Sequence, residues 1–367
     1  MPFLSYPIRK HVSRLAHSHP GNMVSLQAIR ESNARIATSL PSRIVAVFVG
    51  ATSGIGETTL RNLVKQTRKP RIYFLGRREA EGKRIQAELK EINSEGEYHY
   101  LQYDVSLLKN VDEACRHIQS RESAINLLFL TSGTLISGKH TDEGLNYPTA
   151  LVYYCRTRFI VNLLPQLRRA SDLRRVVTVF AGGKEGKIFT EDLQANHISV
   201  LSSRGHITST ITLALHTLAK QAPEVSFVHV YPGFVKTELS RELTGIGAAI
   251  AKILLKPVIA YLEIPIDETG ERQTYFITSA RFPPCDSERR DADGVSLSKG
   301  VDVAVAVDGK VGGGVYSIDY QAEGTSEGVQ EIIRNYIEDN TAEKIWKDTE
   351  EEYMRVTGSL ALWSGTD

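Results

Sequence analysis

Cysteine is scarce in this sequence, and none of the cysteines is placed for a disulfide scaffold or a thiolate metal site. Only three occur among 367 residues, and they are Cys115, Cys155 and Cys285, far apart and without a Cys-x-x-Cys pair. Disulfide frameworks use cysteines in even number, and thiolate metal sites use closely spaced pairs. We therefore expect free thiols, a reducing compartment and no bound metal.

Excess charge and long apolar runs are also missing. The 44 Lys+Arg residues balance 43 Asp+Glu, for a formal net charge of +1, whereas nucleic-acid binders carry a clear basic excess. A membrane helix needs about 20 consecutive apolar residues, and the nearest run, 246–262, is broken by Lys252, Lys256 and Pro257. These features exclude a nucleic-acid partner and a membrane span, and they leave a small molecule as the expected partner.

The first 22 residues contain no acid and several basic residues. Such a segment is typical of an organellar transit peptide, but Pro2, Pro7 and Pro20 would interrupt an amphipathic helix. The alternative, which we favour, is an extension before a second possible start at Met23. We expect residues 1–42 to be an N-terminal extension and the protein to be cytoplasmic, with organellar targeting by residues 1–22 as the alternative.

Short apolar runs alternate with amphipathic stretches from residue 43 onward. Fully apolar runs are typical of strands buried on both faces of a parallel sheet, and the alternation predicts an α/β fold of the Rossmann type, doubly wound and in three layers. The runs are 44–49, 71–75, 98–103, 127–130, 176–180 and 225–231, and the helices expected between them are 57–66, 79–92, 107–120, 151–169 and 209–220. We expect this domain over 43–320, ending in a strand at 315–319, and a C-terminal helical cap over 321–367.

A glycine-rich loop follows the first strand directly. It reads Gly50-Ala51-Thr52-Ser53-Gly54-Ile55-Gly56 and leads into a helix. Glycine is needed where the backbone turns tightly, approaches a pyrophosphate or packs a helix against its strand, and the helix start attracts anions. A tight turn alone would also use glycine, but the position after the first strand favours dinucleotide binding.

The second strand ends in Gly76-Arg77-Arg78. An acid at this position would accept hydrogen bonds from the adenosine ribose, as in NAD sites, whereas glycine and arginine provide room and charge for a 2′-phosphate. Either the two arginines begin a solvated helix face, or they select NADP(H), which we favour. Asp104-Val105 ends the third strand, where a carboxylate can accept from the adenine amino group.

These residues resemble the short-chain dehydrogenase/reductase family. Its Gly-x-x-x-Gly-x-Gly loop matches Gly50, Gly54 and Gly56, its basic position matches Arg77, and its Asp-Val matches residues 104 and 105. A later segment, 231–237, is similar to the family motif whose backbone and threonine contact the nicotinamide carboxamide. The chain looks most like fungal members of secondary-metabolite pathways. The resemblance implies an NADP(H) site made of Gly50, Thr52, Ser53, Gly54, Ile55, Gly56, Arg77, Arg78, Asp104, Val105, Ser132, Gly133, Pro232, Gly233, Val235 and Thr237.

The family's catalytic residues are absent from their expected positions. Only Tyr6 has a lysine four residues later, and it lies far before the sheet. Counting along the chain puts Arg204 and Thr208 at the positions of the family's Tyr and Lys. It puts Ala181 or a neighbouring glycine at the position of its Ser, and Val152 to Tyr154 at that of its Asn. The resemblance therefore implies a non-standard active site.

Candidate replacements exist among nearby polar residues. Arg204 can stabilise an oxyanion but is a poor acid, because its guanidinium stays protonated. His206 titrates near neutral pH without tuning. Tyr153 and Tyr154 are either proton donors or packing aromatics, and Lys184 belongs to a loop that is either catalytic or merely solvated.

Two functions remain open at this level. One is an NADP(H)-dependent oxidoreductase, a ketoreductase or dehydrogenase, and the other is a non-redox isomerase or cyclase, or a cofactor-binding protein without turnover. The apolar segment 238–262 stands where the family's substrate lid closes, which predicts a hydrophobic substrate. The same segment could instead be a packing helix or a contact between copies in a homo-oligomer.

Overall fold

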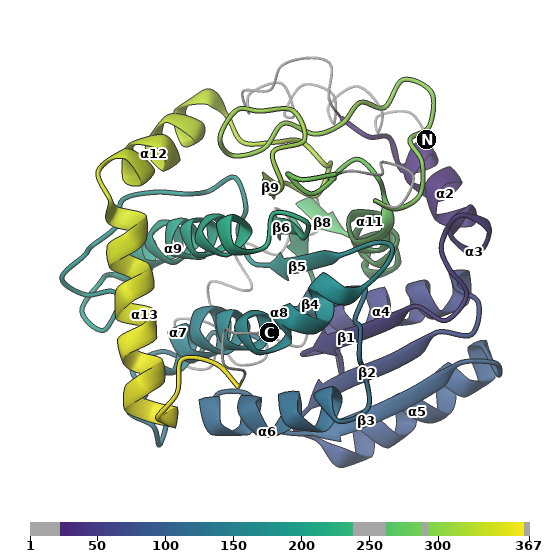
Figure 1. The fold of residues 1–367 in the computed structure, drawn as a ribbon, viewed down its shortest axis with the longest axis horizontal. Coiled ribbons are helices and arrows are strands. Elements are labelled where there is room, and N and C mark those ends of the chain that lie inside the picture. The colour runs from purple at the N-terminus through teal and green to yellow at the C-terminus, as the bar shows by residue number, and fades with distance from the viewer. Residues whose placement is uncertain (1–22, 238–261, 288–292, 363–367) are drawn as a thin grey trace, which may run out of the picture.

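The computed structural model describes residues 23–237, 262–287 and 293–362. Its centre is a parallel sheet of seven strands in the order β3-β2-β1-β4-β5-β6-β9 (Figure 1). This arrangement confirms the predicted Rossmann-type fold. The strands are β1 (Val45–Val49), β2 (Arg71–Gly76), β3 (Glu97–Gln102), β4 (Leu127–Leu130), β5 (Arg175–Val179), β6 (Ser226–Val230) and β9 (Val315–Ile318). The two-residue strands β7 (Phe234–Val235) and β8 (Glu263–Ile264) pair separately.

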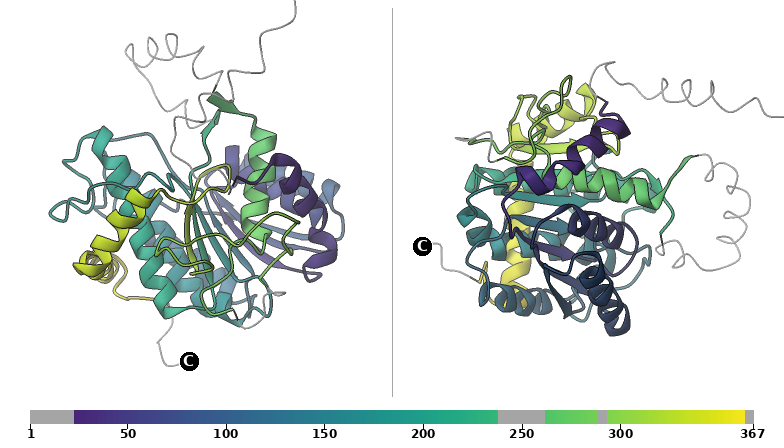
Figure 2. Two further views of the ribbon diagram at one scale, coloured as in Figure 1. Left: turned by 90° about the horizontal axis from the view of Figure 1, so that it is seen from above. Right: turned by 90° about the vertical axis from the view of Figure 1, so that its right-hand side faces the viewer.

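Helices cover both faces of the sheet, which gives three layers (Figure 2). One face carries α4 (Gly54–Gln66), α5 (Glu79–Ile92) and α11 (Ile266–Thr278), with α2 (Leu26–Ala34) packed on α11 and α3 (Ile36–Ser39) after it. The other face carries α6 (Leu108–Gln119), α8 (Cys155–Arg169) and α9 (Val200–Gln221). The C-terminal helices α12 (Glu327–Glu338) and α13 (Thr341–Thr357) pack against α9, and α13 also contacts α6.

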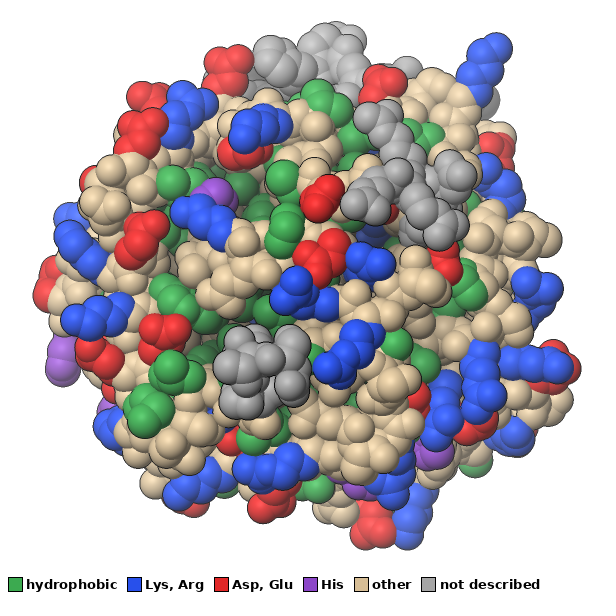
Figure 3. Space-filling view, in the orientation of Figure 1, with side chains coloured by type: hydrophobic (Ala, Val, Ile, Leu, Met, Phe, Trp, Pro, Cys, Tyr) green, Lys and Arg blue, Asp and Glu red, His purple; other side chains and the backbone are tan. Residues whose placement is uncertain are grey.

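The alternation of side chains along each strand builds two hydrophobic cores. Val47 and Val49 of β1 join the core under α6, α8 and α9, whereas Ala46 and Phe48 join the core under α4, α5 and α11. Both sets are fully buried, because a parallel sheet with helices on both faces leaves no strand face to solvent. Acidic and basic side chains are interspersed over the molecular face in Figure 3, in keeping with the balanced charge.

The structure changes two helix predictions. α9 begins at Val200, where the Ser199 side chain caps it, and not at residue 209. The prediction missed its first turns because they contain few apolar residues. The long fourth helix opens with the short α7 (Tyr147–Thr149) and a π-helical turn, Ala150–Tyr154. The C-terminal helical region consists of two helices, α12 and α13, which are separated at Asn340 by its left-handed φ of 62°.

Two expectations fall on residues outside the described ranges. The proposed transit peptide or extension of residues 1–22 is one, and nearly all of the apolar segment 238–262 is the other. Among the helices that are described, none has both the length and the apolar character that a bilayer crossing requires.

Candidate functional site

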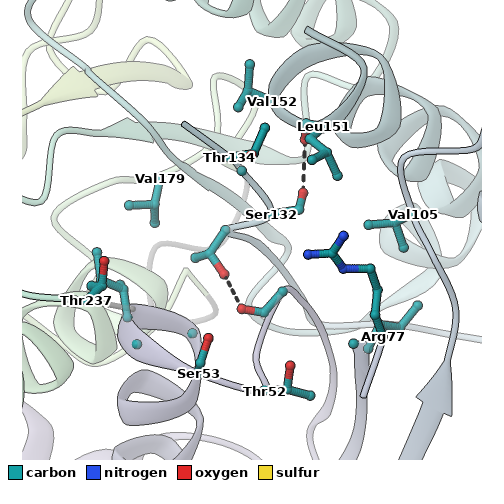
Figure 4. Close-up of a pocket in the computed structure, with 18 of the residues that line it drawn as sticks. Thr52, Ser53, Arg77, Val105, Ser132, Thr134, Leu151, Val152, Val179 and Thr237 are labelled. Atoms are coloured by element: carbon teal, nitrogen blue, oxygen red, sulfur yellow. Dashed lines mark hydrogen bonds between the residues drawn. The ribbon is translucent and has the colours of Figure 1, made fainter. Parts of the chain in front are cut away.

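A cavity of about 900 Å³ opens at the carboxyl edge of the sheet. It is bordered by the loops after β1, β2, β3, β4 and β6 and by the π-helical turn before α8. Strand β1 lies between β2 and β4, so the chain leaves the sheet in opposite directions on its two sides, as at the ligand crevice of doubly wound sheets. Every residue expected to bind the cofactor lines this cavity except Gly233 and Val235. Figure 4 shows the labelled side chains around it.

Three glycines allow the backbone to close tightly around one end of the cavity. Gly50 has a φ of 82°, and a Cβ there would lie 2.7 Å from the Ser132 nitrogen. A Cβ on Gly56 would lie 2.4 Å from the Gly50 oxygen, and one on Gly76 would lie 2.3 Å from the Thr52 methyl. There is therefore no room for a side chain at any of these three positions. The absence of side chains lets the first turn of α4 pack directly against β1.

The start of α4 presents amides to this cradle. Its N-cap residue, Ser53, makes no side-chain capping hydrogen bond, and both Ser53 and Gly54 line the cavity. Helix N-termini whose amides lack side-chain partners bind anions. The cradle and the helix start together fit the pyrophosphate of a dinucleotide.

The cavity is positively charged. Its charged lining residues within the described part of the chain are Arg77, Arg78, Arg156 and Asp104. Arg77 is exposed and donates from Nη1 to the Tyr147 hydroxyl at 2.9 Å, and Figure 4 shows it reaching into the space beside Val105. Asp104 accepts through Oδ1 from the backbone and hydroxyl of Ser106. A polyanionic ligand suits this balance of charge.

Arg156 is a lining residue that the sequence reasoning missed. Its Nη1 donates to the Thr178 hydroxyl at 2.6 Å and the Val179 carbonyl at 2.9 Å, and its Nη2 donates to the Ser132 carbonyl. Burial lowers the pKa of Arg156 to about 10, so it stays charged at neutral pH. The sequence held one signal for it. Arg156 lies four residues after Val152, which was expected near the site, and residues four apart on a helix share a face.

Tyr153 and Tyr154 do not line the cavity. Both are buried, and their hydroxyls contact α13, Tyr153 at the Thr349 hydroxyl (2.7 Å) and Tyr154 at the Asp348 carboxylate (3.2 Å). Burial raises the pKa of both phenols. Their position is that of packing aromatics between α8 and the C-terminal helix.

His206 and Arg204 lie in the first turns of α9, also away from the cavity lining. The buried His206 accepts from the Phe189 amide through Nδ1 and contacts the Leu193 carbonyl through Nε2, both at 3.2 Å. Burial lowers the pKa of His206, so the ring is neutral and holds the loop before α9. Arg204 is exposed. Burial raises the pKa of Tyr231, and the charge of Arg204 offsets part of that rise.

A buried chain of hydrogen bonds fixes the loop after β5. The Glu185 carboxyl accepts from the Thr212 hydroxyl (2.8 Å), which pairs with Nδ1 of His229 (2.9 Å), and Nε2 of His229 accepts from the Ala181 amide (3.3 Å). Burial lowers the pKa of His229 to about 3, which keeps its ring neutral. The backbone of Ala181, a residue that we expected at the family's serine position, is therefore fixed by a hydrogen bond to His229.

No cluster of three or more metal-binding side chains occurs among the described residues. The polar groups of the cavity are three guanidinium groups, the Asp104 carboxylate, hydroxyls and backbone groups, and the excess of positive charge suits an organic anion. Its chemistry is that of a nucleotide site.

Comparisons with known proteins show the family to which the chain belongs. Residues 44–147 match the family model described as short chain dehydrogenase. The oxidoreductase andH of Emericella variicolor is 37% identical over 92% of this chain and 99% of its own length, and the oxidoreductase AN1596 of Emericella nidulans is 37% identical over 89% and 97%. L-sorbose reductase from Gluconobacter frateurii, solved with NADPH and L-sorbose, has the same fold with a TM-score of 0.51 at 17% identity, covering 72% of this chain and 98% of that one. The resemblance inferred from the glycine loop is thus confirmed, and the chain belongs to the short-chain dehydrogenase/reductase family of oxidoreductases.

Proposed function

We propose that this protein is an NADP(H)-dependent oxidoreductase that interconverts a ketone and an alcohol on a hydrophobic small molecule. The observation that carries the proposal is the glycine cradle with arginine, and no acid, at the end of β2. A bound nicotinamide dinucleotide would supply or accept the hydride.

The lining residues divide into segments that suit the parts of the cofactor. The loop of residues 50–56 would hold the pyrophosphate, Asp104 and Val105 the adenine, and residues 232–237 the nicotinamide end. Arg77 and Arg78 would bind the 2′-phosphate, because guanidinium groups form charge-assisted hydrogen bonds with phosphate oxygens. Three free cysteines, of which Cys285 is exposed, support a reducing compartment such as the cytoplasm.

Apolar side chains at the other end of the cavity support a hydrophobic substrate. Leu135, Val152, Val179 and Phe180 line it, and Leu135 is 44% exposed although it is apolar. Apolar lining with few polar groups is usual in small-molecule pockets. The resemblance to fungal family members makes a secondary-metabolite intermediate the substrate that we expect.

A second function is favoured by one specific observation, the replacement of the catalytic side chains. Counting along the chain puts Val152 to Tyr154 at the family's Asn position, Ala181 or a neighbouring glycine at its Ser position, and Arg204 at its Tyr position. An isomerase or cyclase on this scaffold would use the cavity to orient its substrate without net hydride transfer.

Deuterium transfer separates the two functions. With NADPH deuterated at the nicotinamide C4, the oxidoreductase is expected to give product carrying one deuterium, delivered to a single face of the former carbonyl. Mass spectrometry and NMR of the product measure both. Product formed without label, while NADPH is not consumed, would favour the isomerase or cyclase.

Cofactor selectivity is expected to depend on Arg77. Arg77→Asp should weaken NADPH binding by about 10- to 100-fold, because a hydrogen bond to a charged group contributes about 1.5–3 kcal/mol, and should leave NADH binding nearly unchanged. Titration calorimetry with both dinucleotides measures this. Arg116→Asp is the matched control, since Arg116 is exposed on α6 and outside the cavity lining. Equal affinity of the unmodified protein for NADPH and NADH would contradict the 2′-phosphate assignment.

A further inference from the structure

Arg156 of α8 is a buried cation that lines the cavity and bonds only to neutral groups of the described chain. It is 3% exposed, and its acceptors are the Thr178 hydroxyl and the carbonyls of Val179 and Ser132. A buried charge is costly unless an opposite charge or polar groups compensate for it, and burial lowers the pKa of Arg156. A negative charge placed beside this guanidinium would therefore be strongly stabilised.

The guanidinium of Arg156 has more donors than its neighbours use. Each Nη atom carries two N–H groups and Nε carries one. Among the described residues, Nη1 donates to two acceptors and Nη2 to one, which leaves one N–H on Nη2 and the Nε–H without a partner. Nε is buried, so a ligand can only use the free N–H of Nη2. A carboxylate held at two points needs two accessible N–H groups, whereas one donor suits a single charged oxygen.

Nη2 lies beside the end of the cavity that we assign to the substrate. A Cβ on Gly133 would lie 4.0 Å from Nη2 and 3.5 Å from Cγ1 of Val152, and Gly133, Val152 and Arg156 all line the cavity. The acceptors Ser132 and Val179 lie just after β4 and at the end of β5. The glycine loop and the arginines expected at the 2′-phosphate instead follow β1 and β2, on the other side of β4 in the sheet. The free donor of Arg156 therefore faces the substrate side and not the phosphates of the cofactor.

A second buried arginine, Arg175 of β5, has a structural role only. It is 1% exposed and lies outside the cavity lining. Its Nη atoms donate to four backbone carbonyls, those of Phe276, Ser279, Phe282 and Asp293. Every N–H of its two Nη atoms is thus used, whereas Arg156 keeps one N–H free beside a cavity.

We propose that Nη2 of Arg156 donates to the carbonyl oxygen of the substrate and stabilises the alkoxide formed there, an inference that rests on the function proposed above. During reduction, a hydride with its electron pair from the dinucleotide forms a C–H bond at the carbonyl carbon, and the π electrons of the C=O bond move to the oxygen. Fixed donors at the place where charge develops are a major source of catalysis. Water then gives a proton to the alkoxide and leaves as hydroxide, because the guanidinium keeps its own protons.

4-Nitrophenol and 4-nitroanisole are matched probes for this contact. The phenolate carries one negatively charged oxygen on an apolar ring, as the alkoxide would, and the anisole lacks the charge. With NADP⁺ present, at a pH where the phenol is ionised and Arg156 is charged, the unmodified protein should bind the phenolate more tightly than the anisole. Arg156→Gln keeps an amide donor but removes the charge. It should weaken phenolate binding by about 10- to 100-fold, the usual effect of losing a hydrogen bond to a charged group, and leave anisole binding unchanged.

Arg175→Gln is the matched control, since it makes the same change at a buried arginine outside the cavity lining. Calorimetry should give unchanged affinities for both probes. A crystal structure of the unmodified protein with NADP⁺ and 4-nitrophenolate needs no variant, and it should place the phenolate oxygen about 3 Å from Nη2 of Arg156. Equal phenolate affinity in Arg156→Gln and the unmodified protein, or a phenolate oxygen bound elsewhere, would overturn the inference. Neither measurement involves hydride transfer, so the deuterium experiment alone decides the proposed oxidoreductase function.

Discussion

Gly56→Ala is expected to weaken dinucleotide binding by at least about 100-fold. The new methyl group would lie 2.4 Å from the Gly50 oxygen and 2.8 Å from the Ala51 Cα, distances that force α4 away from β1. A displacement of about 1 Å in a binding geometry costs on the order of 100-fold. The strain in the packed interior should also lower the free energy of unfolding by about 1–3 kcal/mol.

Gly328→Ala is the control for this change. Gly328 also lies in the first turn of a helix, α12, but a Cβ there meets nothing within 4 Å. Alanine at an exposed helical position should stabilise the protein slightly, by about 0.5–1 kcal/mol, and leave NADPH affinity unchanged. Calorimetric titration and chemical denaturation of both variants give the comparison. If a folded Gly56→Ala protein bound NADPH with normal affinity, the assignment of the glycine cradle to the dinucleotide site would be wrong.

Arg158→Met is expected to lower the free energy of unfolding by about 3–5 kcal/mol, because it leaves a buried carboxylate without its cation. The Arg158 guanidinium pairs with Asp112 at 2.7 Å, with side-chain exposures of 0% and 4%. It also donates to the carbonyls of Ser359 and Leu360 and lies over the Tyr353 ring at 4.8 Å. One side chain thus joins α6, α8 and the end of α13.

Two further variants separate the ion pair from simple loss of volume. The double variant Asp112→Asn with Arg158→Met should recover part of the lost stability, since no unpaired charge remains. Lys347→Met breaks the exposed pair with Glu351, whose side chains are 78% and 68% exposed, and should change stability by no more than about 1 kcal/mol. Denaturation curves for the unmodified protein and the three variants give the free energies of unfolding. If Arg158→Met and the double variant lost equal amounts, the effect would come from packing and not from the unpaired charge.

Most of the fold could be predicted because its determinants are local. Strands covered on both faces must be apolar throughout, and the loop of residues 50–56 can only close with glycine at its tight points. α11 escaped prediction because Thr269, Gln273 and Thr274 are buried on it and conceal the usual apolar stripe. The π-helical turn at Ala150–Tyr154 also escaped, since its extra residue per turn leaves no pattern in composition.

The site was less predictable, because distance along the chain does not show which face of a helix a residue occupies. The cofactor-binding residues of the glycine loop could be predicted because the loop itself borders the cavity. Tyr153 and Tyr154, chosen by their place in the fourth helix, point to α13, whereas Val152 and Arg156 line the cavity.

The clamp around Arg158 also bears on how the chain folds as it leaves the ribosome. The partners in α6 are synthesised before Arg158, but the Ser359 carbonyl follows it by 201 residues. Before Ser359 is synthesised, the Arg158–Asp112 pair between α8 and α6 lacks the carbonyl groups that cover it in the complete chain. Completion of this part of the core therefore waits for the end of α13 and the residues after it, so a chain shortened before Ser359 lacks the carbonyls that close the clamp.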